Sequence, residues 1–177
     1  MATITGSMTV EQFRQLPETG SFYYELRHGE AVPVTRPKLK HSLIQERLRE
    51  LLERAVPEMF VAVEFPFRAL PEYELRVADV AMVSPDRIQQ ADQEDNLHGA
   101  PDLVVQVLSP SNTVAEINDK EKLCLENGSK EFWVVDPDLR QVKVSTPDGI
   151  TTTFRSGQEI ALRVFGVGML RVDEIFG

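Results

Sequence analysis

The sequence has one cysteine, Cys124, among its 177 residues, and this scarcity excludes several kinds of site. A lone cysteine cannot form an internal disulfide or supply a cysteine-rich zinc site. The apolar stretches are also far shorter than the roughly 18 residues of a membrane-spanning helix, and the first residues lack the basic and apolar blocks of a secretory signal. We therefore expect a cytoplasmic protein with no membrane partner, in which Cys124 is a small buried residue.

Basic residues are also in short supply. The chain has 19 Lys and Arg against 28 Asp and Glu, which gives a net charge of −9. Nucleic acids are bound by neutralising their phosphates with Lys and Arg, so the surface as a whole is not expected to attract them. A phosphate-bearing substrate would need a local basic patch, and segment 36–54 is the richest in Arg and Lys.

No glycine-rich GxGxxG motif, internal repeat, low-complexity tract or clear linker is present. The missing GxGxxG motif and the small number of long helices disfavour a doubly wound dinucleotide-binding fold. The length and the 42% hydrophobic content suit one soluble domain with a sizeable core. We expect residues 1–177 to form a single domain.

The order of predicted elements gives the fold class. Helical spacing and end signals predict helices at 9–16, at 39–56 and between Thr113 and Gly128. Apolar runs and turn signals predict strands within 21–34, 59–70, 75–84, 101–109, 131–136, 140–146 and 150–154. The polar segment 85–100 is expected to be a loop. Helices and strands in this order predict an α/β or mixed α+β fold, with helices flanking one mixed sheet.

Two of the helices begin with a capping box, in which a Thr and an acidic or amide residue three positions later bond each other's main chain. Thr9 and Gln12 have this spacing at the start of the first helix, and Thr113 and Glu116 have it at the start of the third. Gly128 stands where a glycine commonly ends a helix. The third helix is therefore well delimited at both ends.

Two polar residues interrupt apolar strands, and each would be costly to bury without a partner. Asp79 lies inside "RVADVAMV" and Gln106 inside "PDLVVQVLS". If these strands are neighbours, the two side chains approach one point, and Lys120 on the following helix can reach it too. Oxygen ligands on adjacent strands, backed by a lysine, can hold a divalent cation against a phosphodiester.

The same residues also allow a purely structural interpretation. Asp79 could be satisfied by backbone amides, Gln106 could lie on an edge strand, and Lys120 could be a solvated helical lysine. Spacing alone leaves both interpretations open.

Several motifs, taken in order, resemble the Uma2 family, the DUF820 group of restriction-endonuclease-like proteins. They are "YELRHGE", the helix opened by His41, "RVADVAMV", "PDLVVQVLSPSN" and "EKLCLENGSKEFWVVDP". The resemblance extends from about Glu11 to Val144. It implies membership of the PD-(D/E)xK nuclease superfamily, a restriction-endonuclease-like core of mixed sheet flanked by helices, and a magnesium-dependent phosphodiesterase site.

The resemblance assigns roles to individual positions. The first acidic metal ligand falls on Asp79, although the family's usual preceding proline is Ala78 here. The second acidic position, a glutamate in the family's "EVLSPS", falls on Gln106. An amide keeps an oxygen acceptor but loses the negative charge, so metal binding should be weaker. Some Mrr-like branches of the superfamily use glutamine at this place and are nucleases.

The catalytic lysine departs from the superfamily pattern as well. Its usual place, two residues after the second acid, is held by Leu108. The family supplies a lysine from the next helix instead, which corresponds to Lys120, with Lys122 as the second choice. We therefore predict Asp79, Gln106 and Lys120 as catalytic residues, with Asp79 and Gln106 as metal ligands.

The resulting functional prediction is an endonuclease that hydrolyses DNA phosphodiester bonds with Mg²⁺ or Mn²⁺, weakened by Gln106. A homodimer is expected because nucleases of this kind often pair to cut two strands. The alternative is a catalytically inactive nuclease-like fold that binds nucleic acid or protein.

Other candidates have two interpretations each. His41 and Lys122 are candidate substrate-binding residues, and His41 is otherwise an ordinary cap or surface histidine. Glu46 is either an extra acidic ligand or a solvated charge. Glu25 is either a functional acid or half of a structural pair. Asp102 lies on the same strand as Gln106 and is expected to point away from the site.

A positive strip is expected beside the site despite the acidic total. The residues predicted to form it are Arg36, Lys38, Lys40 and Arg76, with Lys120 or Lys122.

Overall fold

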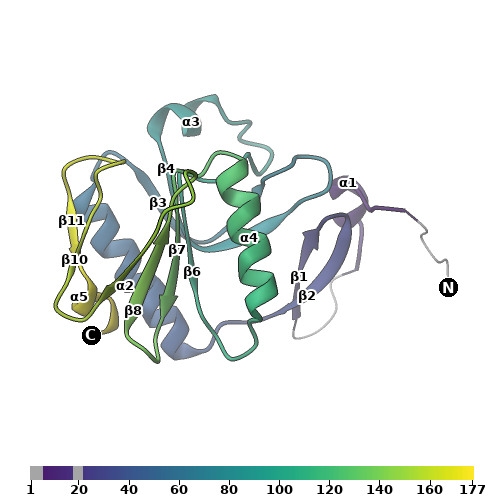
Figure 1. Cartoon of the computed structure of the whole chain (residues 1–177). Coiled ribbons are helices and arrows are strands. Elements are labelled where there is room, and N and C mark those ends of the chain that lie inside the picture. The colour runs from purple at the N-terminus through teal and green to yellow at the C-terminus, as the bar shows by residue number, and fades with distance from the viewer. Residues whose placement is uncertain (1–5, 18–21) are drawn as a thin grey trace.

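The computed structural model describes residues 6–17 and 22–177 (Figure 1). Its helices are α1 (Val10–Phe13), α2 (Leu39–Ala55), α3 (Pro85–Gln90), α4 (Val114–Glu126) and α5 (Val172–Phe176). Its strands are β1 (Phe22–Arg27), β2 (Glu30–Thr35), β3 (Phe60–Arg68), β4 (Arg76–Val83), β5 (Leu97–His98), β6 (Leu103–Val107), β7 (Glu131–Asp136), β8 (Gln141–Ser145), β9 (Thr151–Arg155), β10 (Glu159–Ala161) and β11 (Met169–Arg171).

The centre of the fold is a seven-stranded sheet in the order β5-β3-β4-β6-β7-β8-β9. Strands β3, β4 and β6 run antiparallel to one another, β6 and β7 are parallel, and β7, β8 and β9 are again antiparallel. Helix α4 makes the crossover between the parallel pair β6 and β7. The expectation of a mixed sheet flanked by helices is confirmed.

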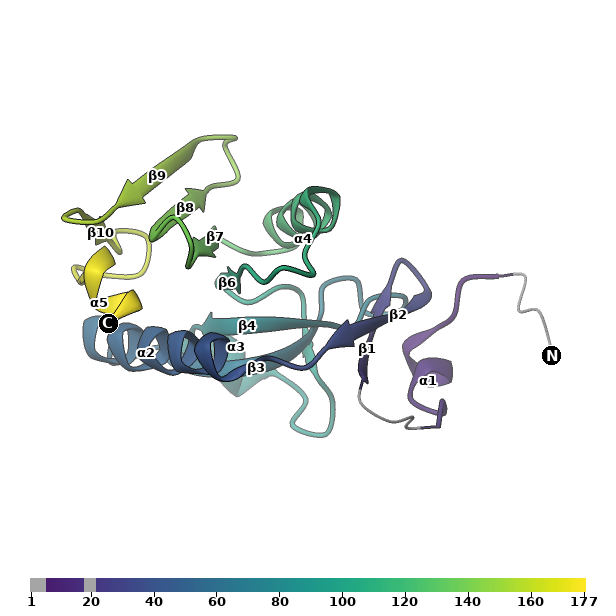
Figure 2. The ribbon, with the colours of Figure 1, turned by 90° about the horizontal axis from the view of Figure 1, so that it is seen from below.

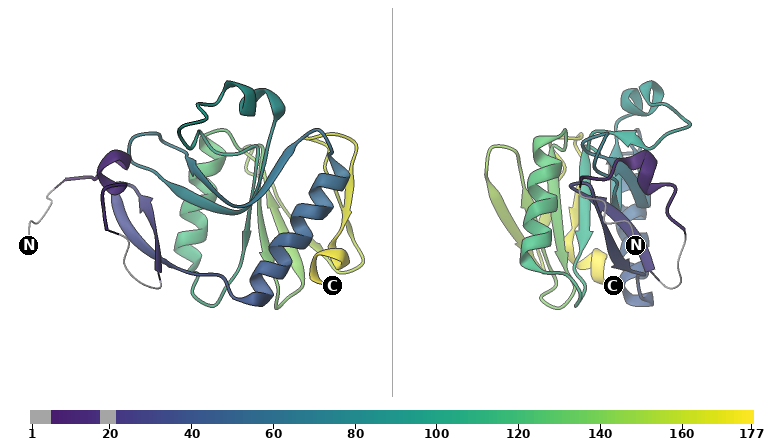
Figure 3. Two further views of the ribbon diagram at one scale, coloured as in Figure 1. Left: turned by 180° about the vertical axis from the view of Figure 1, so that it is seen from behind. Right: turned by 90° about the vertical axis from the view of Figure 1, so that its right-hand side faces the viewer.

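The two long helices cover opposite faces of the sheet (Figures 2 and 3). Ile44, Leu48 and Leu52 of α2 pack into one apolar cluster, which also takes in the C-terminal elements β10, β11 and α5. Ile117 and Cys124 of α4 belong to a second cluster on the other face. The sheet therefore separates two cores, and the ends of its strands are where the two faces meet.

Most of the predicted elements are present. Both capping boxes form, at Thr9 and at Thr113, and Gly128 has a left-handed φ of 119° just beyond α4. Cys124 is fully buried, and this burial raises the pKa of its thiol to about 12, so it behaves as an apolar residue. Ser21, expected at the start of the first strand, lies outside the described residues.

Two regions differ from the expectation. Segment 85–100 is not all loop: it contains α3, which begins with Pro85 at its first position, and the two-residue strand β5, which pairs with the end of β3. A proline at the first helical position loses no hydrogen bond and presets φ, a start signal that the polar composition obscured. The prediction also left 155–177 without elements, whereas β10, β11 and α5 pack against α2 there.

The β1–β2 hairpin lies at one end of the molecule, and β10, β11 and α5 lie at the other (Figure 1). Within 6–17 and 22–177, no helix combines the length and apolar character needed to cross a membrane.

The capping box of α4 gives a test of the fold. Thr113→Ala removes the side-chain acceptor for the Glu116 amide, so unfolding free energy should fall by about 1 kcal/mol. Val114→Ala, at a side chain 77% exposed in the same turn, should change it by less than about 0.5 kcal/mol. Urea denaturation of both variants measures the difference, and equal effects would show that the cap contributes nothing.

Candidate active site

The candidate site forms where two central strands part. Strands β4 and β6 are paired from Met82 and Leu103 as far as Val80 and Val105. Asp79 and Gln106 are the next residues along, at opposed positions just beyond the last pair. The strands stop bonding each other here, and side chains bond the exposed main chain instead.

Three side chains bond this freed main chain. Asp79 Oδ2 accepts a hydrogen bond of 2.6 Å from the Val107 amide. Lys120 Nζ donates to the Val77 carbonyl, and the Val77 amide donates to Glu25 at 2.9 Å. The site residues therefore also hold the strand ends in place.

Lys120 and Gln106 are in direct contact. The lysine is 8% exposed, and its Nζ donates to Gln106 Oε1 at 2.8 Å. Because an ammonium group has no lone pair to offer, the contacting atom of Gln106 must be its oxygen. The Gln106 Nε2 group makes a long hydrogen bond of 3.4 Å to the Val107 carbonyl oxygen.

Asp79 belongs to a second group of side chains. One ligand atom each of His41, Glu64 and Asp79 lies within 4.8 Å of the other two, and all three residues are half-buried. His41 Nε2 is 3.5 Å from Asp79 Oδ1, so the start of α2 contacts β4 directly. Two carboxylates and an imidazole at this separation form a donor set that can hold a metal ion.

Glu64 reaches this point through an unusual backbone conformation. Its φ is +48°, in the left-handed region, and the neighbouring pairs of Val63 with Val80 and Phe65 with Ala78 place it across from Asp79. Non-glycine residues rarely adopt this conformation, and when they do they are often found at functional sites.

The strand changes faces at Glu64. Val61 and Val63 pack into the apolar cluster on the α2 side, whereas Phe65 and Phe67 pack into the cluster on the α4 side. Uninterrupted alternation would send all four to one face. The left-handed residue reverses the alternation at the centre of the site.

Electrostatics at the cluster favour a cation. Burial raises the pKa of the Glu64 carboxyl, and the negative charge of Asp79 raises it further. Burial opposes protonation of His41, but its hydrogen bond to Asp79 and the charges of Asp79 and Glu64 raise its pKa. The negative charge of Asp79 contributes to both shifts, and a positive ion would offset the repulsion between Asp79 and Glu64.

The other candidate residues fall in different places. Lys122 is exposed, two residues away from the inward-facing Lys120, and stays a prediction for substrate binding. Glu46 points outward and pairs with Arg49 at 2.9 Å. Beside His41, α2 turns Gln45 toward the site instead, a residue 2% exposed that donates to Glu64.

Glu25 forms the structural pair that was one of its two interpretations. It is 4% exposed and pairs with Arg27 at 2.8 Å. Burial would raise the pKa of its carboxyl, but the charges of Lys120 and Arg27 and the Val77 amide lower it below its usual value. The buried carboxylate is thus one counter-charge for Lys120.

Asp102 lies at the far end of β6 from the predicted cleft, and Arg76 is buried. Asp102 accepts from the Ser84 amide at 2.9 Å and from Arg87 at 3.2 Å, at the other end of β6. Arg76 was expected in a positive strip, but this expectation is wrong. It is 1% exposed and pairs with Glu74 at 2.6 Å and Asp119 at 2.9 Å, so its charge is neutralised inside the protein.

Sequence reasoning overlooked Glu64. The available signal was the one that pointed to Asp79, a carboxylate inside an apolar strand, here "FVAVEFPFR". Of the two interpretations of Glu46, the solvated charge holds, because the helical phase that faces the sheet includes Gln45 with Ile44 and Leu48, and excludes Glu46.

Comparison with known structures identifies the class of fold. A crystal structure from Anabaena variabilis ATCC 29413, described as "a putative nuclease belonging to DUF820", superposes with a TM-score of 0.79 over 96% of this chain and 97% of that chain, at 23% sequence identity. The chain therefore has a nuclease-like fold. The sequence pattern of Uma2, described as "Putative restriction endonuclease", matches residues 10–171, and the chain belongs to this family. No curated protein matches the sequence.

Metal-linked stability tests the cluster of His41, Glu64 and Asp79. Mn²⁺ at a hundred times its dissociation constant should raise unfolding free energy by about 2.7 kcal/mol. Glu64→Gln keeps an oxygen that can accept from Gln45 but removes one charge, so it should be at least as stable without metal and gain much less from Mn²⁺. Thermal melts with and without Mn²⁺ measure both effects.

Glu46→Gln is the matched control, because it removes an exposed carboxylate from α2 without touching the cluster. A wild-type protein that gains no stability from Mn²⁺ would contradict a metal site here, as would an equal gain in wild type and Glu64→Gln.

Proposed function

We propose that the protein is a metal-dependent endonuclease that hydrolyses phosphodiester bonds in DNA. The observation that carries the proposal is the convergence of His41, Glu64 and Asp79 beside the Lys120–Gln106 contact. Membership of the Uma2 family and the nuclease-like fold support the same reaction class.

The donor set fits a hard or borderline divalent ion. Carboxylate oxygens suit Mg²⁺ and Mn²⁺, and an imidazole nitrogen shifts the preference toward a transition metal. His41, Glu64 and Asp79 would hold the ion, with Mn²⁺ bound more tightly than Mg²⁺. Such an ion polarises a phosphoryl oxygen and lowers the pKa of a bound water.

Because of Glu64, the site does not need a carboxylate at position 106 as its second acidic ligand. A site formed by Asp79 and Gln106 alone would have one carboxylate, whereas Glu64 supplies the second from β3. Gln106 then serves chiefly to hold Lys120, through an oxygen that keeps a second lone pair for a cation. The loss of the acid at 106 therefore weakens the site without removing its charge.

Lys120 is the residue placed to meet the substrate's negative charge. Its ammonium group has three donors, of which Val77 and Gln106 take two. We assign the third to a phosphate oxygen next to the metal position, where the positive charge would stabilise negative charge that develops in the transition state.

Exchanges at position 106 test its two roles separately. Gln106→Glu should tighten Mn²⁺ binding by on the order of tenfold and raise cleavage, because it adds a charge beside the ion. Gln106→Met removes the acceptor for Lys120 at similar volume, so it should slow cleavage, and it should weaken metal binding far less than loss of a carboxylate would, because the lost oxygen is neutral. Calorimetry and a plasmid-nicking assay measure the two properties, and identical behaviour of both variants would refute the assignment.

Asp79 and Lys120 should differ in the step they affect. Asp79→Asn keeps an acceptor for the Val107 amide, so it should fold normally while losing metal binding and cleavage. Lys120→Ala should lower turnover roughly a hundredfold, the scale for one lost transition-state donor, with little change in metal affinity. Cleavage of supercoiled and single-stranded DNA is measured with Mg²⁺ and with Mn²⁺.

The inactive alternative has a clear signature in the same experiments. Wild type and Gln106→Glu would both be folded, and neither would bind metal or cut any nucleic acid. That outcome would replace the nuclease by a binding module built on the same fold.

A further inference from the structure

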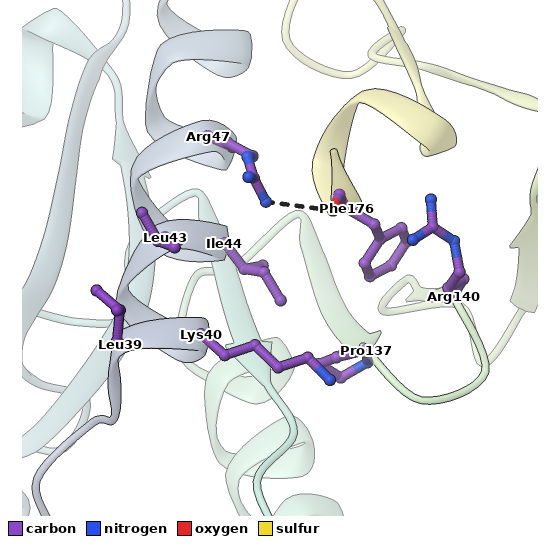
Figure 4. Close-up of a pocket in the computed structure, with 8 residues that line it drawn as sticks. All are labelled: Leu39, Lys40, Leu43, Ile44, Arg47, Pro137, Arg140 and Phe176. Atoms are coloured by element: carbon purple, nitrogen blue, oxygen red, sulfur yellow. Dashed lines mark hydrogen bonds between the residues drawn. The ribbon is translucent and has the colours of Figure 1, made fainter.

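A cavity of about 320 Å³ lies between the first turns of α2, the β7–β8 turn and the C-terminal helix α5 (Figure 4). Its volume is at the lower end of the range for small-ligand sites. Its apolar lining comes from Leu39, Leu43 and Ile44 of α2, Pro137 of the turn and Phe176 of α5. A flat apolar group of modest size would fit this lining.

The remaining walls are basic, in a chain whose net charge is −9. Arg47 donates to the Phe176 carbonyl at 3.2 Å and is thereby engaged within the protein. Lys40 is 70% exposed and contacts the exposed carboxylate of Asp138 at 3.5 Å. Arg140 is exposed, and its guanidinium lies 5.2 Å from the centre of the Phe176 ring. Lys40 and Arg140 therefore present positive charge at the opening.

Arg140 holds this position in an unfavourable backbone conformation. Its φ is +50°, where glycine or asparagine is usual, at the end of a turn that Asp136 already stabilises through the amides of Asp138 and Leu139. A glycine would serve the turn better. The arginine is therefore better explained by what its side chain does over Phe176 than by the turn.

The cavity lies beside the candidate active site. Lys40 immediately precedes His41, which contacts Asp79. Strand β7 is the parallel neighbour of β6, so the turn that follows β7 is at the same end of the sheet as Gln106. A strand of substrate that reaches the metal cluster would have its next nucleotides near this opening.

We propose that this cavity binds one unpaired nucleotide of a single-stranded segment next to the cleaved bond. The base would pack on Phe176 and the apolar wall, and Lys40 and Arg140 would contact its flanking phosphates. A paired base is stacked inside its duplex and cannot enter such a cavity. The inference rests on the proposed nuclease function, and it adds a preference for single-stranded or frayed nucleic acid.

Arg140→Gly separates this role from folding. It should leave the melting temperature unchanged or higher, because glycine suits the left-handed turn position. It should weaken binding of a short fluorescein-labelled oligothymidylate about fivefold at about 0.1 M salt, and reduce the slope of log affinity against log salt by about 0.7. Fluorescence anisotropy in EDTA measures this without metal or cleavage.

Two further variants serve as controls, one expected to tighten oligothymidylate binding and one expected to leave it unchanged. Asp138→Asn removes the carboxylate beside Lys40 and should tighten oligothymidylate binding. Arg163→Ala removes an exposed arginine from the β10–β11 connection, near the far end of α2, and should change nothing. A hairpin duplex should bind more weakly than oligothymidylate, and Arg140→Gly should barely affect it.

Oligothymidylate affinity that Arg140→Gly leaves unchanged would overturn the proposal, even if wild type cuts DNA. If Arg140→Gly weakens binding as expected but wild type cuts nothing with Mn²⁺, the nucleotide site stands and the nuclease assignment falls. Sedimentation addresses a different occupant: a wild-type dimer that Leu43→Glu dissociates without changing oligothymidylate affinity would make this face a contact between copies, and would also overturn the proposal.

Discussion

The site depends on one constraint: every buried main-chain group at the point where β4 and β6 separate must still find a hydrogen-bond partner. Beyond the Val80–Val105 pair, the strands no longer supply each other's donors and acceptors. Asp79 accepts a hydrogen bond from the Val107 amide. Glu25 accepts one from the Val77 amide, and Lys120 donates one to the Val77 carbonyl. Some of the polar residues that could perform chemistry are thus the ones that bond the separated ends of β4 and β6. These bonds hold the side chains in place more firmly than a loop would.

The opening also brings the two faces of the sheet together. The left-handed residue Glu64 reverses the alternation of β3 next to Asp79, so its carboxylate meets His41 and Gln45 from α2. Lys120 arrives from α4, on the opposite face. Helix α2 therefore contributes His41 and Gln45 around the two carboxylates, and α4 contributes the ammonium group. In a continuous sheet, paired strands would lie between the two helices, and side chains from α2 and α4 could not reach the same point.

Much of this arrangement could be predicted from sequence, because burying a polar side chain in an apolar strand needs an explanation wherever it occurs. That reasoning located Asp79 and Gln106, and the capping box at Thr113 fixed the helix that carries Lys120. The same signal, a carboxylate inside the apolar strand "FVAVEFPFR", was present at Glu64 but was overlooked. The positive φ that turns this carboxylate toward Asp79 could not be predicted, because it leaves no mark in residue type when glycine is absent. Arg76 was misplaced for another reason: its burial, which brings it together with Glu74 two residues before it and with Asp119 of α4, depends on tertiary packing.

Under the proposed function, the charges at the site determine how metal binding and nucleic-acid binding affect each other. Glu64 and Asp79 lie close together and repel an approaching phosphate until a cation offsets them. The charge of Lys120 acts on Glu64 but is shared with Glu25, so it offsets the two carboxylates only in part. A divalent ion at the cluster would reverse the sign of the local field, so binding of metal and of a polyanion near the cleaved bond should reinforce each other. The exposed charges of Lys40 and Arg140 do not depend on this ion, since Lys40 lies beside the solvated carboxylate of Asp138, and Arg140 lies over the Phe176 ring and near the exposed acid Asp173. Under the two proposals, nucleic acid would therefore be held beside the cluster before the metal binds.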